Sequence, residues 1–208
     1  MTQGQETRKR LVAAAAGIFN TRGYSGTAVS DLMTATGLQK GGIYRHFESK
    51  EQLAVEAFDY AFEMAVRVRF EGFDRLTSPV EQLRHFIRNF VHRRSPIPGG
   101  CPMVNTAVEN DDGNPALKQR ARQAVSAFVD RLVETVERGI EQGEINSDTE
   151  ARTFALLLFS ALEGALVVSR LQGSFKPLEA VALTLEHYLD ERVESSPTPV
   201  KAIRHRCR

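Results

Sequence analysis

The chain has 208 residues, 42% hydrophobic and 25% charged, which suits one large domain or a small domain joined to a larger one. Its two cysteines, Cys101 and Cys207, are too few and too far apart for a disulfide framework, and no Cys/His cluster has metal-ligand spacing, so we expect a reducing cytoplasm, no metal and no other cofactor. The net charge of +1 is unevenly spread. Residues 1–50 carry seven Lys/Arg against three Asp/Glu, residues 51–194 carry sixteen against twenty-three, and residues 195–208 carry four against none, so contact with a polyanion is expected in the first fifty residues.

The first predicted helix covers residues 5–22 and ends at Gly23. Basic residues 8–10 followed by the apolar run 11–19 imitate a secretory signal, but the run stops at residues 20–22 without a cleavage site, and its apolar residues form one helical stripe. The most apolar segment of the chain, residues 154–169, is short and is interrupted by a glutamate. We therefore predict neither a signal peptide nor a membrane span.

Residues 27–50 predict two short helices separated by a tight turn. Val29, Leu32 and Met33 recur at helical spacing, and Thr27 stands where a capping hydroxyl belongs. Gly37 can end the first helix, because glycine adopts the left-handed conformation without steric cost.

The second short helix has one apolar and one polar face. Leu38, Ile43 and Phe47 are predicted to point inward. The outer face then consists of Gln39, Lys40, Gly41, Gly42, Tyr44, Arg45 and His46. A face that is cationic, aromatic and glycine-bearing suits a DNA groove, where amides and lysine meet phosphates and other side chains meet base edges.

The rest of the chain reads as further helices, with no hairpin signal and no strand alternation. Caps are predicted at Ser49, Ser78, Asn114 and Asp148. The expected helices cover residues 50–73, 79–94, 103–109, 115–143, 149–171 and 177–193. The predicted fold is all-α with nine helices, and residues 195–208 are expected to be a disordered tail.

A specific pattern in the first fifty residues closely resembles the helix-turn-helix signature of TetR-type transcriptional regulators. It consists of Val29, Asp31, Leu32, Gly37, Leu38, Lys40, Gly41, Ile43, Tyr44, His46, Phe47, Lys50 and Leu53. Three residues depart from the usual pattern: Met33 replaces a small alanine, Gln39 a capping serine, and Gly42 a Ser, Thr or Ala. The last two departures bear on which bases are read.

The resemblance implies a nine-helix TetR-like fold with three parts. Residues 1–50 would be a helix-turn-helix DNA-binding domain, and residues 51–194 a ligand-binding and dimerisation domain, followed by the tail 195–208. It also implies a homodimeric regulator, not an enzyme, whose partners are double-stranded operator DNA and a small-molecule effector. A repressor released from a palindromic operator is the first expectation. The alternatives are an activator or a sequence-tolerant DNA-organising protein of the same fold.

The resemblance also assigns candidate DNA contacts. Thr27, Tyr44 and Lys50 match positions that usually touch phosphates in the family. Gln39, Lys40 and Arg45 are the expected base readers, since arginine bidentate to guanine is the commonest specific contact. His46 can serve as a phosphate donor or can pack beside the neighbouring phenylalanine, and Tyr44 has the same structural alternative.

Dimer formation is also expected from the sequence itself. Residues 154–169 are apolar nearly all round, more than the core of one protomer needs, and Ala161, Gly164 and Ala165 permit close helix approach. The alternative is a central buried helix of a monomer.

Outside the predicted DNA-binding domain, the sequence shows no catalytic constellation. His85, His92, His187 and His205 each lack a nucleophile or a partner carboxylate at a recognisable spacing. Phenylalanines at helical spacing could line an apolar ligand cavity, but they can equally be core.

Cys101 is the candidate effector-sensing residue. It follows two glycines and precedes a short helix, whose amide dipoles are expected to lower the pKa of the thiol. The segment 100–106 also resembles one found in a branch of the family with electrophile-sensing members. The alternatives are a cysteine that only fills space and an enzyme that consumes electrophiles at this thiol.

Overall fold

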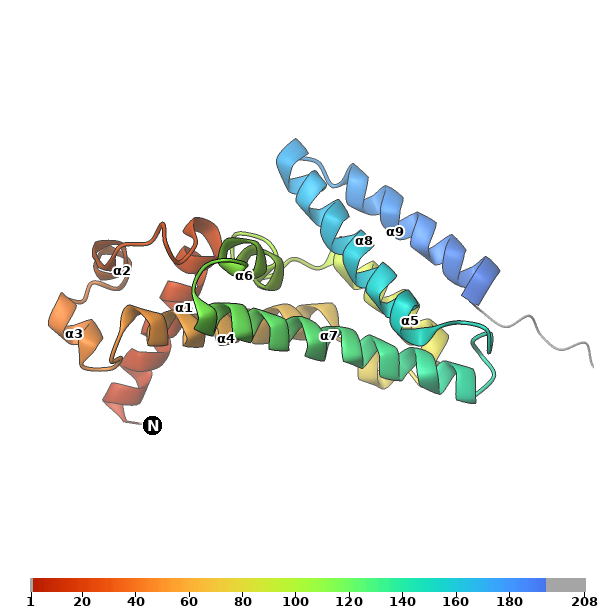
Figure 1. The fold of residues 1–208 in the computed structure, drawn as a ribbon, viewed down its shortest axis with the longest axis horizontal. Helices are drawn as coiled ribbons and strands as arrows, with labels where there is room; N and C mark the ends of the chain where they lie inside the picture. The colour runs from red at the N-terminus through yellow and green to blue at the C-terminus, as the bar shows by residue number, and fades with distance from the viewer. Residues whose placement is uncertain (1, 194–208) are drawn as a thin grey trace, which may run out of the picture.

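The computed structural model describes residues 2–193 and is built of helices (Figure 1). Within those residues there are nine α-helices and no strand, as predicted. They are α1 (Gln3–Arg22), α2 (Val29–Thr36), α3 (Lys40–Tyr44), α4 (Lys50–Arg69), α5 (Pro79–His92), α6 (Pro102–Asn110), α7 (Pro115–Glu141), α8 (Ala151–Gln172) and α9 (Lys176–Tyr188). A 3-10 turn, η1 (Phe73–Arg75), precedes α5, and a π-helical turn, η2 (Leu189–Val193), follows α9. The predicted tail 195–208 lies outside the described residues.

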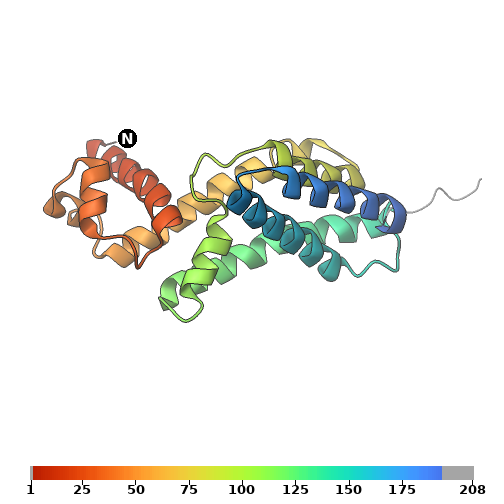
Figure 2. The same cartoon turned by 90° about the horizontal axis from the view of Figure 1, so that it is seen from above.

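The molecule is elongated, with a small head at one end and a longer helical body (Figures 1 and 2). Helices α1–α3 form the head, and α4 runs from the head along the body. Each part has its own apolar cluster, and the head cluster also takes in Leu53, Ala57 and Ala61 of α4 and Ile97 of the loop before α6. The first half of α4 therefore belongs to the head core, and a domain boundary at residue 50 stays a prediction.

Locally capped helix starts were predicted correctly. The hydroxyls of Ser49 and Ser78 and the side-chain oxygen of Asn114 accept from the third amide of α4, α5 and α7. At the start of α4 the side-chain oxygen of Gln52 also accepts from the amide of Glu48. The predicted cap of α8 is wrong. Glu150, and not Asp148, caps α8, with its carboxylate accepting from the amides of residues 152 and 153.

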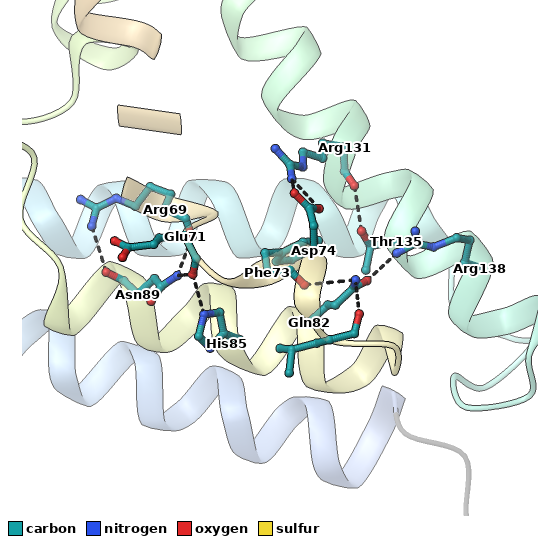
Figure 3. A network of polar contacts seen from close by, with 11 residues as sticks. Arg69, Glu71, Phe73, Asp74, Gln82, His85, Asn89, Arg131, Thr135 and Arg138 are labelled. Carbon is teal, nitrogen blue, oxygen red and sulfur yellow. Dashed lines mark hydrogen bonds and ion pairs between the residues drawn. The ribbon is translucent and has the colours of Figure 1, made fainter. Parts of the chain in front are cut away.

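The predicted end of α4 near residue 73 is also wrong: the helix ends at Arg69. Beyond this end, the Asn89 side chain of α5 donates to the carbonyls of Arg69 (3.0 Å) and Glu71 (3.0 Å), which would accept helical amides if α4 continued (Figure 3). Gly72 then reverses the chain at a φ of 80°. His85 bonds the Glu71 carbonyl at 2.7 Å, so α5 terminates α4 through side chains.

The same network fixes η1 between α5 and α7 (Figure 3). The buried amide of Gln82 donates to the carbonyls of Phe73 (3.3 Å) and Leu76 (2.8 Å). Arg138 of α7 donates to the Gln82 oxygen, and Arg131 pairs with Asp74 at 2.8 Å. Polar side chains thus connect η1, α5 and α7.

The remaining helix ends differ from prediction by a few residues. Helix α1 begins at Gln3 behind a Thr2 capping box, α5 ends at His92, and α6 spans Pro102–Asn110. Helix α7 ends at Glu141, and the predicted last helix ends with the π turn at Val193. These shifts leave the order of elements unchanged.

Two polar junctions tie the head to the body. Asn105 of α6 donates to the backbone carbonyl (3.1 Å) and side-chain oxygen (3.0 Å) of Asn20 at the end of α1, and the Asn20 amide donates to the carbonyls of Pro98 and Gly100. Glu109 of α6 forms the second junction.

Helix α8 is the one described helix that is long and apolar enough to cross a membrane, and half of its most apolar window is buried inside the protein. Core helices of soluble proteins meet the same criterion, so this is weak evidence for a span. Its buried side packs on α7 and α9 in the core.

Candidate nucleic-acid interface

The two short helices stand on a buried apolar base. Leu32 of α2, Ile43 of α3 and Phe47 after it are at most 2% exposed and pack with α1 and α4. Gly37 ends α2 in the left-handed conformation, at a φ of 70°, with its amide donating to the carbonyl of Met33. The predicted turn and inward face are therefore confirmed.

The predicted DNA-reading residues lie together on the outward face of the head. Gln39, Lys40, Gly41, Tyr44 and Arg45 are exposed, and Gly42 and His46 are half-buried. Gln39 precedes α3 and makes no side-chain capping bond, so its amide is available on this face. Helix α3 and its two cap residues thus present two cationic side chains, an amide and a phenol, groups that can donate to phosphates and base edges.

Thr27 does not have the predicted capping role. It is 1% exposed, and its hydroxyl donates to the carbonyl of Gly23 at 2.6 Å. Ala28 is the cap residue of α2, and the Asp31 carboxylate accepts its amide at 2.8 Å. Because the Thr27 hydroxyl is turned into the head, its burial opposes the phosphate contact expected of this residue.

Lys50 is held at the head–body boundary. Its ammonium donates to the carbonyl of Tyr24 at 2.6 Å and lies 4.2 Å from the centroid of the Tyr24 ring. The Glu109 carboxylate accepts from the amides of Tyr24 and Ser25, each at 2.8 Å. The turn after α1 therefore connects the start of α4 with α6.

Cys101 differs from the prediction in its chemistry. It precedes α6 as expected, but burial and the neighbouring Glu163 raise the pKa of its thiol well above the ordinary value. The amides of Met103 and Val104 act in the predicted direction, and their effect is the smaller one. Cys101 is half-buried, and the expectation that the pKa of its thiol is lowered is wrong.

Two functional candidates in the body were missed by sequence reasoning. Glu163 of α8 is 5% exposed, and Arg69 of α4 is 9% exposed. Burial raises the pKa of the Glu163 carboxyl and lowers that of the Arg69 guanidinium. Both line a small cavity with Cys101. A lone glutamate inside the most apolar segment was the available signal.

Known proteins resemble the chain along nearly its whole length. A family model described as "Bacterial regulatory proteins, tetR family" matches residues 11–57, and one described as "Tetracyclin repressor-like, C-terminal domain" matches residues 79–185. An uncharacterized HTH-type transcriptional regulator of Mycobacterium tuberculosis is 31% identical over 195 residues, covering 89% of this chain and 95% of the relative. The HTH-type transcriptional repressor DhaR of a Mycobacterium species is 26% identical, covering 83% and 86%.

A solved structure shares the fold. The crystal structure of a TetR transcriptional regulator from Chloroflexus aurantiacus is 44% identical and superposes with a TM-score of 0.90, covering 94% of this chain and all of that one. Both family models, the relatives and the fold agree with the exposed helix-turn-helix face. The chain therefore belongs to the TetR family of helix-turn-helix transcriptional regulators, which bind DNA and are not enzymes.

Proposed function

We propose that the protein is a cytoplasmic homodimeric repressor that binds a palindromic operator and leaves it when a small molecule occupies the body. The observation that carries the DNA-binding part is the outward face of α3, where Lys40, Tyr44 and Arg45 are exposed over a buried base. Gln39, Gly41, Gly42, His46 and Lys50 complete the proposed contact surface. The relative DhaR is named a transcriptional repressor, which supports repression over activation for this chain.

An unpartnered apolar face on α8 and α9 supports the homodimer. On α8, Leu156, Leu157, Val167, Val168 and Leu171 are between 41% and 83% exposed. On α9, Leu183 is 55% exposed. Gly164 has open space where a side chain would stand, so a second helix can approach closely there. In a two-fold symmetric dimer, the same face of a second copy of this chain would pack against this one.

The body and the head are connected by contacts that an effector could shift. The cavity beside Cys101 is bounded by the loop of residues 95–101, and Asn20 of α1 bonds two carbonyls of that loop. A ligand that moves the loop would move the end of α1. Thermodynamic linkage then requires that bound effector lowers the affinity for operator by the same factor as bound operator lowers the affinity for effector.

The operator-binding proposal is tested by comparing Arg45→Ala with Lys50→Ala. Arg45→Ala should relax preference at one base position of each half-site, at a cost of about 1–3 kcal/mol. Lys50→Ala should weaken binding to all sequences. It should also reduce the slope of log affinity against log salt concentration (the salt slope) by roughly one counterion per protomer. Both are measured by selection on a randomised operator library and by salt titration.

A footprint supplies the geometric control. Two recognition helices of a dimer predict half-site centres about 34–36 Å apart, or a little more. A footprint on one asymmetric half-site, or an Arg45→Ala variant with unchanged base preference, would contradict the proposal.

Glu109 should hold the DNA-competent orientation of the head. Glu109→Ala removes two bonds from backbone amides to a charged acceptor, and we expect operator affinity to fall by about tenfold. Glu109→Gln makes the same charge change but keeps an acceptor oxygen, so it should lose less. Since no phosphate contact is removed, the salt slope of both variants should stay that of the wild type. Equal losses in the two variants would count against an orienting role.

A further inference from the structure

The cavity at Cys101 lies where the loop of residues 95–101 meets α4, α6, α7 and α8. Its volume is about 10 Å³, which is room for one water-sized group. Its apolar walls include Ala65, Met103 and Phe128. Its polar side chains are those of Arg69, Ser95, Cys101 and Glu163. A cavity of this kind accepts a small polar end group attached to an apolar body.

One oxygen of the cavity wall lacks a partner. Glu163 is 95% buried, since its exposure is 5%, and its Oε2 has no hydrogen bond within the described residues. The Cys101 thiol and the Arg69 guanidinium are the neighbouring groups that act on this carboxyl. A buried carboxyl oxygen without a donor costs free energy, so a ligand donor at this point would be strongly favoured.

A guanidinium faces the same space. All three hydrogen bonds of Arg69 leave from Nη1, to the carbonyls of Asn89, Phe90 and Arg93 at 3.1, 3.3 and 2.7 Å. Its central carbon lies 4.0 Å from the centroid of the Phe90 ring. The group is therefore fixed by backbone and ring, and it brings a positive charge to the wall that Glu163 balances.

This balance selects the charge of the ligand. A cation beside Glu163 would meet Arg69, and an anion beside Arg69 would meet Glu163, whereas an uncharged group meets no repulsion. A hydroxyl is the size of a water molecule, and it can donate to Glu163 while accepting from Arg69. We propose that this cavity is the anchoring site of the effector and takes the hydroxyl of a neutral, largely apolar alcohol or phenol. This rests on the proposed function.

The small volume gives such a ligand a means of signalling. Only its hydroxyl fits the cavity as it stands, so the apolar remainder must displace a wall. The loop of residues 95–101 has two glycines with positive φ, Gly99 at 106° and Gly100 at 93°. Asn20 of the head holds that loop. Displacing the loop would therefore transmit ligand binding to α1.

The first experiment measures ligand selectivity in the full-length wild type without DNA. Benzyl alcohol, benzylammonium, benzoate and toluene share one ring and differ in the end group. We expect calorimetry to show benzyl alcohol binding about tenfold or more tightly than the other three, the size of one hydrogen bond to a charged group. Bound benzyl alcohol should also slow alkylation of Cys101 by iodoacetamide relative to Cys207. Failure to bind benzyl alcohol, or equal binding of all four probes, would overturn the proposal.

The second experiment changes the selectivity. In Glu163→Gln the Arg69 charge is uncompensated, so preference should move from benzyl alcohol to benzoate by about tenfold or more. Glu137→Gln makes the same charge change on an exposed position of α7 and should keep the wild-type order. An unchanged order in Glu163→Gln would overturn the anchoring role. If that variant does not fold, the wild-type panel and the alkylation result decide. Operator binding is measured separately, so its absence would contradict the proposed function alone.

Discussion

Replacing Val168 by aspartate should convert the protein into a monomer and weaken operator binding by about 10²–10⁴-fold. Val168 is 42% exposed on the outward apolar face of α8, where a partner helix would cover the new carboxylate and strip it of water. A monomer loses the second half-site contact, and the avidity lost is of that size. Light scattering of the free protein and fluorescence anisotropy on one palindromic fragment measure the two effects.

Val108→Asp is the matched control. Val108 is 77% exposed on α6, outside the face formed by α8 and α9, so a carboxylate there stays in water. It should leave both mass and operator affinity near the wild type. If Val168→Asp remained dimeric, or if both variants lost affinity equally, the α8–α9 face would not be the dimer interface.

The sequence predicted those helix ends that depend on neighbours in the chain. Ser49, Ser78 and Asn114 each bond an amide three residues ahead, and such spacing can be read directly. The end of α4 depends on Asn89, twenty residues away from Arg69, and no local pattern announces that contact. Element order was therefore predictable, whereas ends set by tertiary side-chain contacts were not.

The same contrast between local and tertiary contacts applies to the two candidate sites, the outward face of α3 and the surroundings of Cys101. The outward face of α3 follows from helical period, because Ile43 and Phe47 are apolar and Lys40 and Arg45 are not. The chemistry of Cys101 depends on a glutamate 62 positions later, Glu163, whose proximity only the fold creates. The neighbouring sequence predicts the helix amides, which lower the pKa of the thiol. It does not predict the burial, which raises that pKa by more.

Gly99→Ala should lower the free energy of unfolding by about 3 kcal/mol or more. A side chain at a φ of 106° is strained by about 1–3 kcal/mol. The new Cβ would also stand 2.4 Å from the backbone oxygen of Asn20 and 2.8 Å from its carbonyl carbon, so α1 must shift. That shift breaks hydrogen bonds between Asn20 and the loop, each worth about 0.5–1.5 kcal/mol. At roughly 2–4 °C per kcal/mol, the melting temperature should fall by about 6–12 °C in calorimetry.

Gly143→Ala separates backbone strain from the clash. Gly143 also has a positive φ, 73°, but a Cβ there has nothing within 4 Å, so this variant should show the strain alone. The additional loss in Gly99→Ala then measures the junction between head and body, and hydrogen exchange should rise at the end of α1 in that variant only. Equal losses in the two variants would mean that the Asn20 junction contributes little, and the effector would then have to act on the head through the Glu109 contact to Tyr24 and Ser25.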